Sequence, residues 1–217
     1  MNTKKLYLIA YNSAHAIGWA LVLGAFLFQS ISNKGFSGEG IYSTVACALS
    51  GLQLVMSLDD VHAIVKLVQS PPLTVAMQIA SRVFVVLILH QFVASRSCVG
   101  LSMILIAWCP TEVIRYTYYV LRTLGKSDSA LPPQLIWLRY SSFIVLYPTG
   151  VFGELTILWS SLRQVSADPF WHPLSILIYV IIFAIYPVGF YVLYTYMLSQ
   201  RKKNLNVSSV IPPKKIQ

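Results

Sequence analysis

Six runs of apolar residues, separated by short polar or Gly/Pro-bearing breaks, occupy most of the chain. They cover about Leu6–Ser30, Ile41–Leu58, Leu73–Ser95, Val99–Leu121, Leu135–Leu162 and Pro173–Leu198. A helix needs about 20 apolar residues to cross the hydrocarbon core of a bilayer, and lipid-exposed backbone must satisfy its own hydrogen bonds. The pattern therefore predicts an all-α, polytopic membrane protein with six transmembrane helices. Residues 1–200 form the predicted single transmembrane domain, and residues 201–217 form a basic tail.

Composition supports this class. Hydrophobic residues make up 56% of the chain and charged residues 11%, and the mean hydropathy is +0.66. The formal net charge is +9, but the basic residues stand at the ends of apolar runs rather than in an aromatic-interleaved patch, so no nucleic-acid partner is expected. The three cysteines are scattered without metal-ligand spacing, and neither a metal nor an organic cofactor is predicted.

The distribution of lysine and arginine predicts the orientation. If both termini share one side, that side collects ten basic residues against three on the other, Lys34, Arg96 and Arg163. The positive-inside rule then places both termini in the cytosol. The chain ends KKIQ, with Lys214 and Lys215, and this tail resembles the dilysine signal that returns membrane proteins to the endoplasmic reticulum. No small-residue cleavage site follows the first run, so an uncleaved first span is expected.

The fifth run contains the strongest candidate chemistry. Trp137 and Trp159 stand about 33 Å apart on a helix, as interfacial anchors would. Between them lie Tyr147 and Glu154, seven residues apart, which places both on one helix face. Pro148 between them is expected to bend or loosen the helix. An ionisable residue at that depth is costly and marks a functional site, so this pair is a candidate for proton transfer.

The fourth run holds Glu112 and Arg115 three residues apart, either a self-neutralised pair or part of the site. Cys109 and Arg115 have the spacing of the phosphate-binding loop of tyrosine phosphatases. We reject that interpretation, because the intervening residues are acidic and predicted to be helical, so their amides are already bonded. Arg82 is expected to face a carboxylate or a substrate anion. Arg139, close to Trp137, is expected to snorkel to the interface.

Other polar residues have structural interpretations. His62 and His90 are expected to be satisfied groups facing the bundle, since no second ligand lies at metal spacing. Two tyrosine clusters are expected to anchor the chain at the interface. They are Tyr116, Tyr118, Tyr119 and Tyr191, Tyr194, Tyr196.

The stretches LRYSSFIVLYPTGVFGEL and WCPTEVIRYTYY, with Tyr11–Asn12 and QIASR ending at Arg82, closely resemble the very-long-chain 3-hydroxyacyl-CoA dehydratases, the tyrosine-phosphatase-like A or PASTICCINO family. The resemblance covers about Tyr7 to Leu198. It implies a six-span enzyme of the endoplasmic reticulum that performs the third step of fatty-acid elongation. The catalytic pair that it implies is Tyr147 and Glu154. Many members have Arg at Gln69 and Trp at Leu87.

The resemblance implies loss of water from a (3R)-3-hydroxyacyl-CoA to give the trans-2-enoyl-CoA. Desolvation favours a protonated carboxylic acid, so Glu154 is assigned as general acid and Tyr147 as base. Tyr147 needs a nearby cation to act as base, and Arg115 and Arg82 are the candidates. Glu154 is expected about 25 Å from the cytosolic end, so the acyl chain must enter a cavity enclosed by the helices. CoA would be held at its mouth by basic residues such as Arg122, Lys126 or Lys66.

Two other classes of function remain open. One is a non-catalytic paralogue that serves the elongase as a regulatory scaffold or binds phosphoproteins, which the departures at Gln69 and Leu87 would suit. The other is a proton-coupled channel or transporter, disfavoured because no internal repeat is detected. The expected partners are long-chain acyl-CoA, membrane lipids, and the condensing enzyme, ketoacyl reductase and enoyl reductase of the elongase.

Overall fold

The computed structural model describes residues 3–32, 35, 39–65, 67, 72–125 and 131–210, which are helical apart from short connections and contain no strand. Lys34, Lys66, Gln69, Lys126, Lys214 and Lys215 lie outside these described residues. The helices are α1 Thr3–Ser32, α2 Glu39–Met56, α3 Leu58–Ile64, α4 Pro72–Gln91, α5 Val93–Arg96, α6 Gly100–Thr123, α7 Pro133–Ser141, α8 Phe143–Ala167, α9 His172–Val180, the π-helix η2 Ile181–Ile185, and α10 Tyr186–Val210. The all-α prediction is confirmed.

Each predicted apolar run is helical, and three of them contain an interruption. The second run divides at Ser57, the third at Phe92 and the fifth at Ser142. Phe92 has an extended backbone, with φ −118° and ψ 114°, which ends α4 and lets α5 start in a new direction. At the C-terminus α10 continues through the predicted domain boundary at residue 200 to Val210.

Four helical stretches among the described residues are long and apolar enough to cross a membrane, fewer than the six predicted. They are Thr3–Ser32, Gly40–Ile64, Pro133–Ala167 and His172–Leu205. The apolar part of α4, Ala76–Gln91, is shorter. The helix α6 has the length, but Glu112, Arg115 and Arg122 make it more polar. Length and composition therefore define a membrane protein with several apolar helices.

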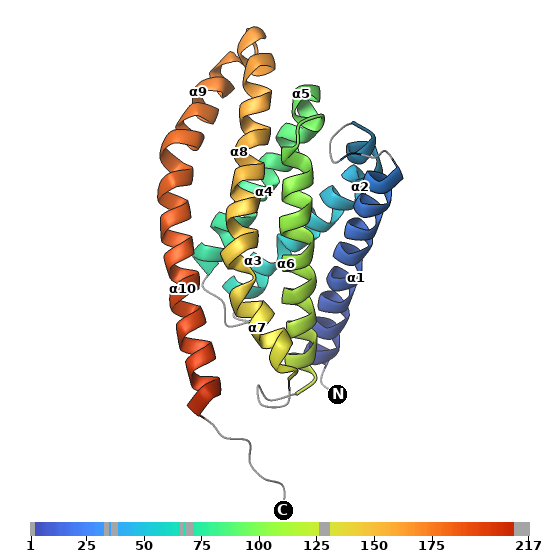
Figure 1. The fold of residues 1–217 in the computed structure, drawn as a ribbon, viewed down its shortest axis with the longest axis vertical. Coiled ribbons are helices and arrows are strands. Elements are labelled where there is room, and N and C mark those ends of the chain that lie inside the picture. The colour runs from blue at the N-terminus through green and yellow to red at the C-terminus, as the bar shows by residue number, and fades with distance from the viewer. Residues whose placement is uncertain are drawn as a thin grey trace, which may run out of the picture.

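The helices form an elongated bundle in which successive segments run in alternating directions (Figure 1). The start of α1 and the end of α10 lie at the same end of the bundle, called here the terminus end. At the centre, α6 packs against α1 on one side and α8 on the other, while α10 runs along the edge (Figure 1). The core between these helices is fully apolar in places, with Trp19, Ile104 and Ile157 buried.

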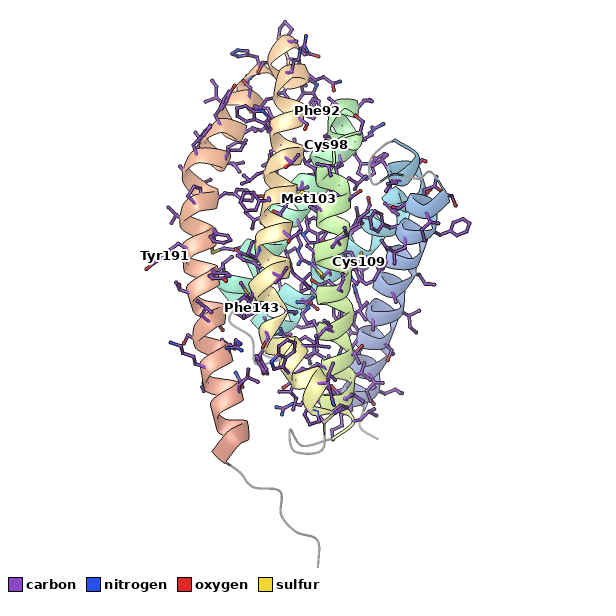
Figure 2. The ribbon with its side chains drawn as sticks, in the orientation of Figure 1. Phe92, Cys98, Met103, Cys109, Phe143 and Tyr191 are labelled. Atoms are coloured by element: carbon purple, nitrogen blue, oxygen red, sulfur yellow. The ribbon has the colours of Figure 1, made fainter. Side chains whose placement is uncertain are left out.

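The outer face of the bundle is apolar. Large side chains such as Phe28, Phe183 and Val188 are more than half exposed. Tyr191 on α10 points away from the bundle and is 70% exposed (Figure 2). A soluble monomer seldom exposes so large an apolar area, whereas a lipid-facing surface requires it. Trp137 and Trp159 are also exposed, as interfacial anchors should be.

Candidate functional site

A cavity of about 670 Å³ lies within the bundle, lined by residues of α1, α2, α3, α4, α6, α7, α8 and α10. The part of α8 that lines it runs from Phe143 to Glu154, and the part of α6 runs from Ala107 to Thr123. The α8 stretch belongs to the half of that helix nearer the terminus end, and the α6 stretch covers the corresponding half of α6 and extends past its middle (Figure 1). The volume is that of a typical small-molecule site. The cavity therefore extends from the level of Glu154 toward the terminus end, where Arg122, Tyr140 and Gln200 line it.

Tyr147 and Glu154 both line this cavity, as their seven-residue spacing predicts. Pro148 lies inside α8 without ending it; the interruption comes earlier, at Ser142. The Tyr147 ring stacks on Phe190 of α10, with centroids 5.4 Å apart and planes 15° apart, and on Tyr194 at 6.4 Å. These contacts between α8 and α10 fix the ring in the cavity wall. Within the described part of the chain, the Tyr147 hydroxyl makes no hydrogen bond, so it can accept or donate one to a ligand.

Glu154 is buried, with 6% of its surface exposed. The Tyr186 hydroxyl of α10 donates a hydrogen bond of 2.6 Å to Glu154 Oε2. The side chains of Trp108 on α6 and Ser81 on α4 also approach the carboxyl group. Glu154 therefore meets polar side chains from three other helices.

Arg82 contributes the nearest positive charge. It forms an ion pair with Glu112, and its guanidinium lies over the Trp108 ring, 5.0 Å from the centroid. It also interacts electrostatically with both Tyr147 and Glu154. Arg82 thus fits the prediction of a carboxylate partner. Of the two cations proposed for Tyr147, it is the one that lies in electrostatic contact with this tyrosine.

Arg115 belongs to a separate part of the network. Its Nε lies 2.7 Å from Glu112 Oε2, so the predicted contact between these two side chains is present. Its Nη2 lies 2.8 Å from Asp59 Oδ2 of α3 and donates to the Tyr116 hydroxyl at 2.8 Å. Together the four charges alternate in sign as Arg82, Glu112, Arg115 and Asp59. Glu112 and Arg115, the pair expected to neutralise itself, are therefore the middle two residues of a network of four charges whose net charge is zero.

Asp59 is a residue that the sequence reasoning missed. Besides Arg115, it accepts hydrogen bonds from Tyr11 at 2.8 Å and Tyr116 at 2.9 Å. The signal in the sequence is the acidic pair Asp59–Asp60 at the end of the second apolar run. Charged residues are costly to insert into a membrane, so this pair marks a candidate functional position. Sequence alone could not name the partner, because Asp59 and Arg115 are 56 residues apart.

Tyr186 was missed as well, although it carries a signal. It opens the sequence YPVG at residues 186–189, which repeats the YPTG of residues 147–150. The two tyrosines face the same site from α8 and α10, and their hydroxyl groups interact electrostatically. A search for short repeated motifs, rather than for duplicated halves, would have identified Tyr186.

The expectation that these tyrosines are interface anchors is wrong for three of them, including Tyr118, which is buried and lines the cavity. Tyr116 has no exposed surface and bonds Asp59, and Tyr194 stacks on Tyr147. Tyr191, exposed on α10, fits the expectation. Hydropathy does not separate these residues, because an anchor and a buried hydrogen-bonding tyrosine have the same side chain.

Arg139 lies in the cavity wall near the terminus end, with its guanidinium 5.7 Å from the Tyr119 ring centroid and its Nη2 3.4 Å from the Tyr119 hydroxyl. His62 bonds the Tyr7 hydroxyl at 2.9 Å, and His90 bonds the hydroxyls of Tyr42 and Ser50. Both histidines are thus satisfied polar groups, as predicted, but only His62 is buried in the bundle, whereas His90 is exposed. Among the described residues, no three His, Cys, Asp or Glu side chains gather as a metal site would require.

The stretch from Cys109 to Arg115 is helical, as expected, and belongs to α6. Cys109 is fully buried, and Arg115 is engaged by Asp59 and Glu112. A phosphate-binding loop would need free backbone amides pointing into an open pocket. This geometry agrees with the rejection of phosphatase chemistry.

The chain belongs to the family described as protein tyrosine phosphatase-like protein, PTPLA, whose model matches residues 53–207. It is 38% identical to a very-long-chain (3R)-3-hydroxyacyl-CoA dehydratase of Caenorhabditis elegans, over 94% of this chain and 96% of that protein. It is 34% identical to the dehydratase PASTICCINO 2A of Oryza sativa subsp. japonica, over 93% and 94% of the two chains. No solved structure matches the chain.

Proposed function

We propose that this protein is a hydro-lyase that converts very-long-chain (3R)-3-hydroxyacyl-CoA to trans-2-enoyl-CoA. The observation that carries the proposal is that Tyr147 and Glu154 line one cavity in a chain related, over nearly its whole length, to proteins with that name. A buried carboxyl group and a phenol are suited to moving one proton each. The elongation cycle of fatty acids contains such a dehydration, so the proposed role is the third step of that cycle.

The proposed reaction uses each side chain once. Tyr147, starting as the phenolate, takes the proton from C2 of the acyl chain, and the C–H electron pair forms the C2=C3 double bond. The C3–O bond breaks, and the hydroxyl leaves as water with the proton of Glu154. The enzyme then holds a neutral Tyr147 and an ionised Glu154. Transfer of the proton from Tyr147 to Glu154 restores the starting state without exchange with solvent.

Arg82 supports the base role of Tyr147. A phenolate in an apolar cavity needs a nearby positive charge, and Arg82 interacts with Tyr147 while it is paired with Glu112. Because Glu112 also contacts Arg115, it shares its charge between two arginines. In this proposal the positive charge of Arg82 is only partly neutralised by Glu112, so it can stabilise the Tyr147 phenolate. The roles of Glu112 and Arg115 are to hold Arg82 in place.

The cavity supports a substrate that enters from the terminus end. Between Ser142 and Glu154 the wall of α8 is about 18 Å long at 1.5 Å per residue. In the proposal, CoA stays at the mouth near Arg122 and Arg139, and its arm reaches the catalytic pair. Lys66 and Lys126, the other proposed CoA contacts, lie outside the described residues.

We propose six spans in the endoplasmic-reticulum membrane with both termini in the cytosol, a domain over residues 1–200 and a dilysine-like signal in the tail. The alternating helix directions and the shared end of α1 and α10 support this topology (Figure 1). The condensing enzyme and the two reductases of elongation are proposed partners. Tags at each terminus test the topology: both should bind antibody when only the plasma membrane is permeabilised. A tag that stays hidden until the reticulum membrane is opened would contradict it.

The experiment that tests the function is conversion of a long-chain 3-hydroxyacyl-CoA by the detergent-purified protein, beside Tyr147→Phe and Glu154→Gln. Loss of one positioned acid or base is expected to lower the rate by about 100-fold or more. Tyr191→Phe, on the outer face, is the matched control and should retain the parent rate. A folded parent without activity over a range of chain lengths would refute the dehydratase assignment and favour a scaffold.

A further inference from the structure

Tyr186 makes the one direct hydrogen bond that joins α10 to Glu154 among the described residues. Its hydroxyl donates to Oε2 at 2.6 Å, a short distance for a phenol–carboxyl contact. The acceptor of this bond is Oε2. Trp108 and Ser81 also approach the Glu154 carboxyl group, so Tyr186 is one of three polar side chains around it.

The backbone before Tyr186 has the form needed to aim it at Glu154. The π-helix η2 spans Ile181–Ile185 and ends immediately before Tyr186. Ile178, Ile182, Tyr186 and Phe190 form the less exposed face of this segment, and they recur every four residues. An α-helix turns once per 3.6 residues, so residues spaced four apart would move progressively off one face of the helix. The wider π turn absorbs the extra residue and keeps Tyr186 on the inner face, and such turns are frequent at functional sites.

The position of the hydrogen bond decides where the acidic proton of Glu154 resides. A neutral carboxylic acid has one oxygen that carries the proton and one that accepts hydrogen bonds. If Glu154 is protonated while Tyr186 donates to Oε2, the proton is on Oε1. When Glu154 releases this proton to the departing hydroxyl, the Tyr186 bond remains and strengthens, since its acceptor has become charged. The same bond thus orients the acid and stabilises its conjugate base.

We propose that Tyr186 is a positioning residue that holds the Glu154 proton on Oε1 and stabilises the carboxylate formed as water leaves. This rests on the proposed role of Glu154 as general acid. It assigns Tyr186 a part in the chemical step and none in substrate binding. Removing its hydroxyl should therefore lower kcat and leave KM unchanged.

The test compares the purified parent with Tyr186→Phe, Glu154→Gln and Tyr191→Phe. Tyr186→Phe should lower kcat about 10- to 100-fold, as expected for one lost hydrogen bond to a charged group, with KM within twofold of the parent. Tyr191→Phe, which removes the same hydroxyl on the exposed face of α10, should match the parent in both. A Tyr186→Phe variant with the parent kcat would overturn the proposal, and so would an unchanged kcat with a raised KM.

Infrared difference spectroscopy gives a second readout that does not depend on turnover. The carbonyl stretch of protonated Glu154 is the band absent from Glu154→Gln. In Tyr186→Phe it should shift to higher wavenumber, because Oε2 has lost its donor. A band that does not move would overturn the proposal. If Tyr186→Phe does not fold, the parent band decides: a frequency typical of a hydrogen-bonded acid carbonyl supports the bond, and that of a free carbonyl refutes it.

The two proposals fail in different ways. If the parent is active, Glu154→Gln is inactive and Tyr186→Phe is fully active, only the positioning role is lost. If Glu154→Gln keeps the parent rate, the acid assignment itself is wrong. The infrared shift would then report the hydrogen bond alone, and the proposed part of Tyr186 in the chemical step would fail with the acid.

Discussion

Asp59 shows how single residues allow charge inside this bundle. A charged group in a low-dielectric region is tolerated when it is paired and hydrogen-bonded. Asp59 meets both conditions, since Arg115 supplies the charge and Tyr11 and Tyr116 supply donors. The neighbouring Asp60 has no ion pair within the described residues, and one of its carboxyl oxygens is buried without a hydrogen-bond partner there. Two adjacent aspartates thus have different roles.

Asp59→Asn is therefore expected to destabilise the fold, by about 3 kcal/mol. The substitution removes the charge opposite Arg115, and the new amide presents N–H donors to groups that are donors themselves. Asp60→Asn is the matched control and should change stability little. The measurement is the midpoint of thermal unfolding in detergent. Equal midpoints for the two variants would show that the Asp59 network does not contribute to stability.

The crossing of α6 and α8 is the element-scale feature that places Glu154. Gly100 and Gly153 meet there: a Cβ added to Gly153 would lie 2.9 Å from the Gly100 carbonyl oxygen, and one added to Gly100 would lie 2.6 Å from the Gly153 carbonyl oxygen. Small residues let helix backbones approach closely in a membrane. Because Gly153 directly precedes Glu154, the crossing fixes how far Glu154 extends into the cavity.

Gly153→Ala should force α6 and α8 apart. The added methyl would also lie 2.9 Å from side-chain atoms of Met103 and Ile104, so no single side chain can yield. We expect a loss of about 1–3 kcal/mol in stability and a lower kcat, because Glu154 moves with its helix. Gly24→Ala, with nothing within 4 Å of its added Cβ, should be neutral or slightly stabilising. Unfolding midpoints and turnover of the two variants check this; a stable, fully active Gly153→Ala would show that the crossing can relax.

At the scale of the whole molecule, the cavity extends toward one end of the bundle, the terminus end. It begins near Glu154, in the middle of α8, and extends toward the end where α1 starts and α10 ends. Arg201 of α10 donates to Ser141 at 3.1 Å, which ties α10 to α7 at this end. Basic residues at the mouth suit an anionic carrier such as CoA, and the far end of α8 carries Arg163 on an exposed position.

Arg122→Gln is accordingly expected to raise KM about fivefold with little change in kcat. The reason is that a contact with CoA worth about 1 kcal/mol at the open mouth of the cavity stabilises the ground state and the transition state equally. Arg163→Gln, the same change at the opposite end, should leave both constants unaltered. Steady-state kinetics over a range of acyl-CoA concentrations measures both. A larger effect from Arg163→Gln would mean that CoA enters from the other side.

The separation of two residues along the sequence decides whether their contact could be predicted before the fold was known. The helical runs, the face shared by Tyr147 and Glu154, and the contact of Glu112 with Arg115 are local, so helix geometry predicted them. The partner of Arg82 and the second partner of Arg115 were open, because Glu112 and Asp59 lie 30 and 56 residues away from these arginines in the sequence. The span count also differs, because the apolar part of α4 is short and the charges of α6 lower its hydropathy, although both helices were predicted.

The sequence by itself determined that the chain is helical and apolar, which segments form helices, and which two residues share one face of α8. These properties depend on hydrophobic period and residue type, which are written in order along the chain. Only the tertiary structure decided that Asp59 completes the charge chain, that Tyr186 bonds Glu154, and that the cavity extends from Glu154 toward the terminus end. Each of these depends on how distant helices pack and how the π turn of η2 rotates a side chain, and packing between helices is set by shape rather than by spacing.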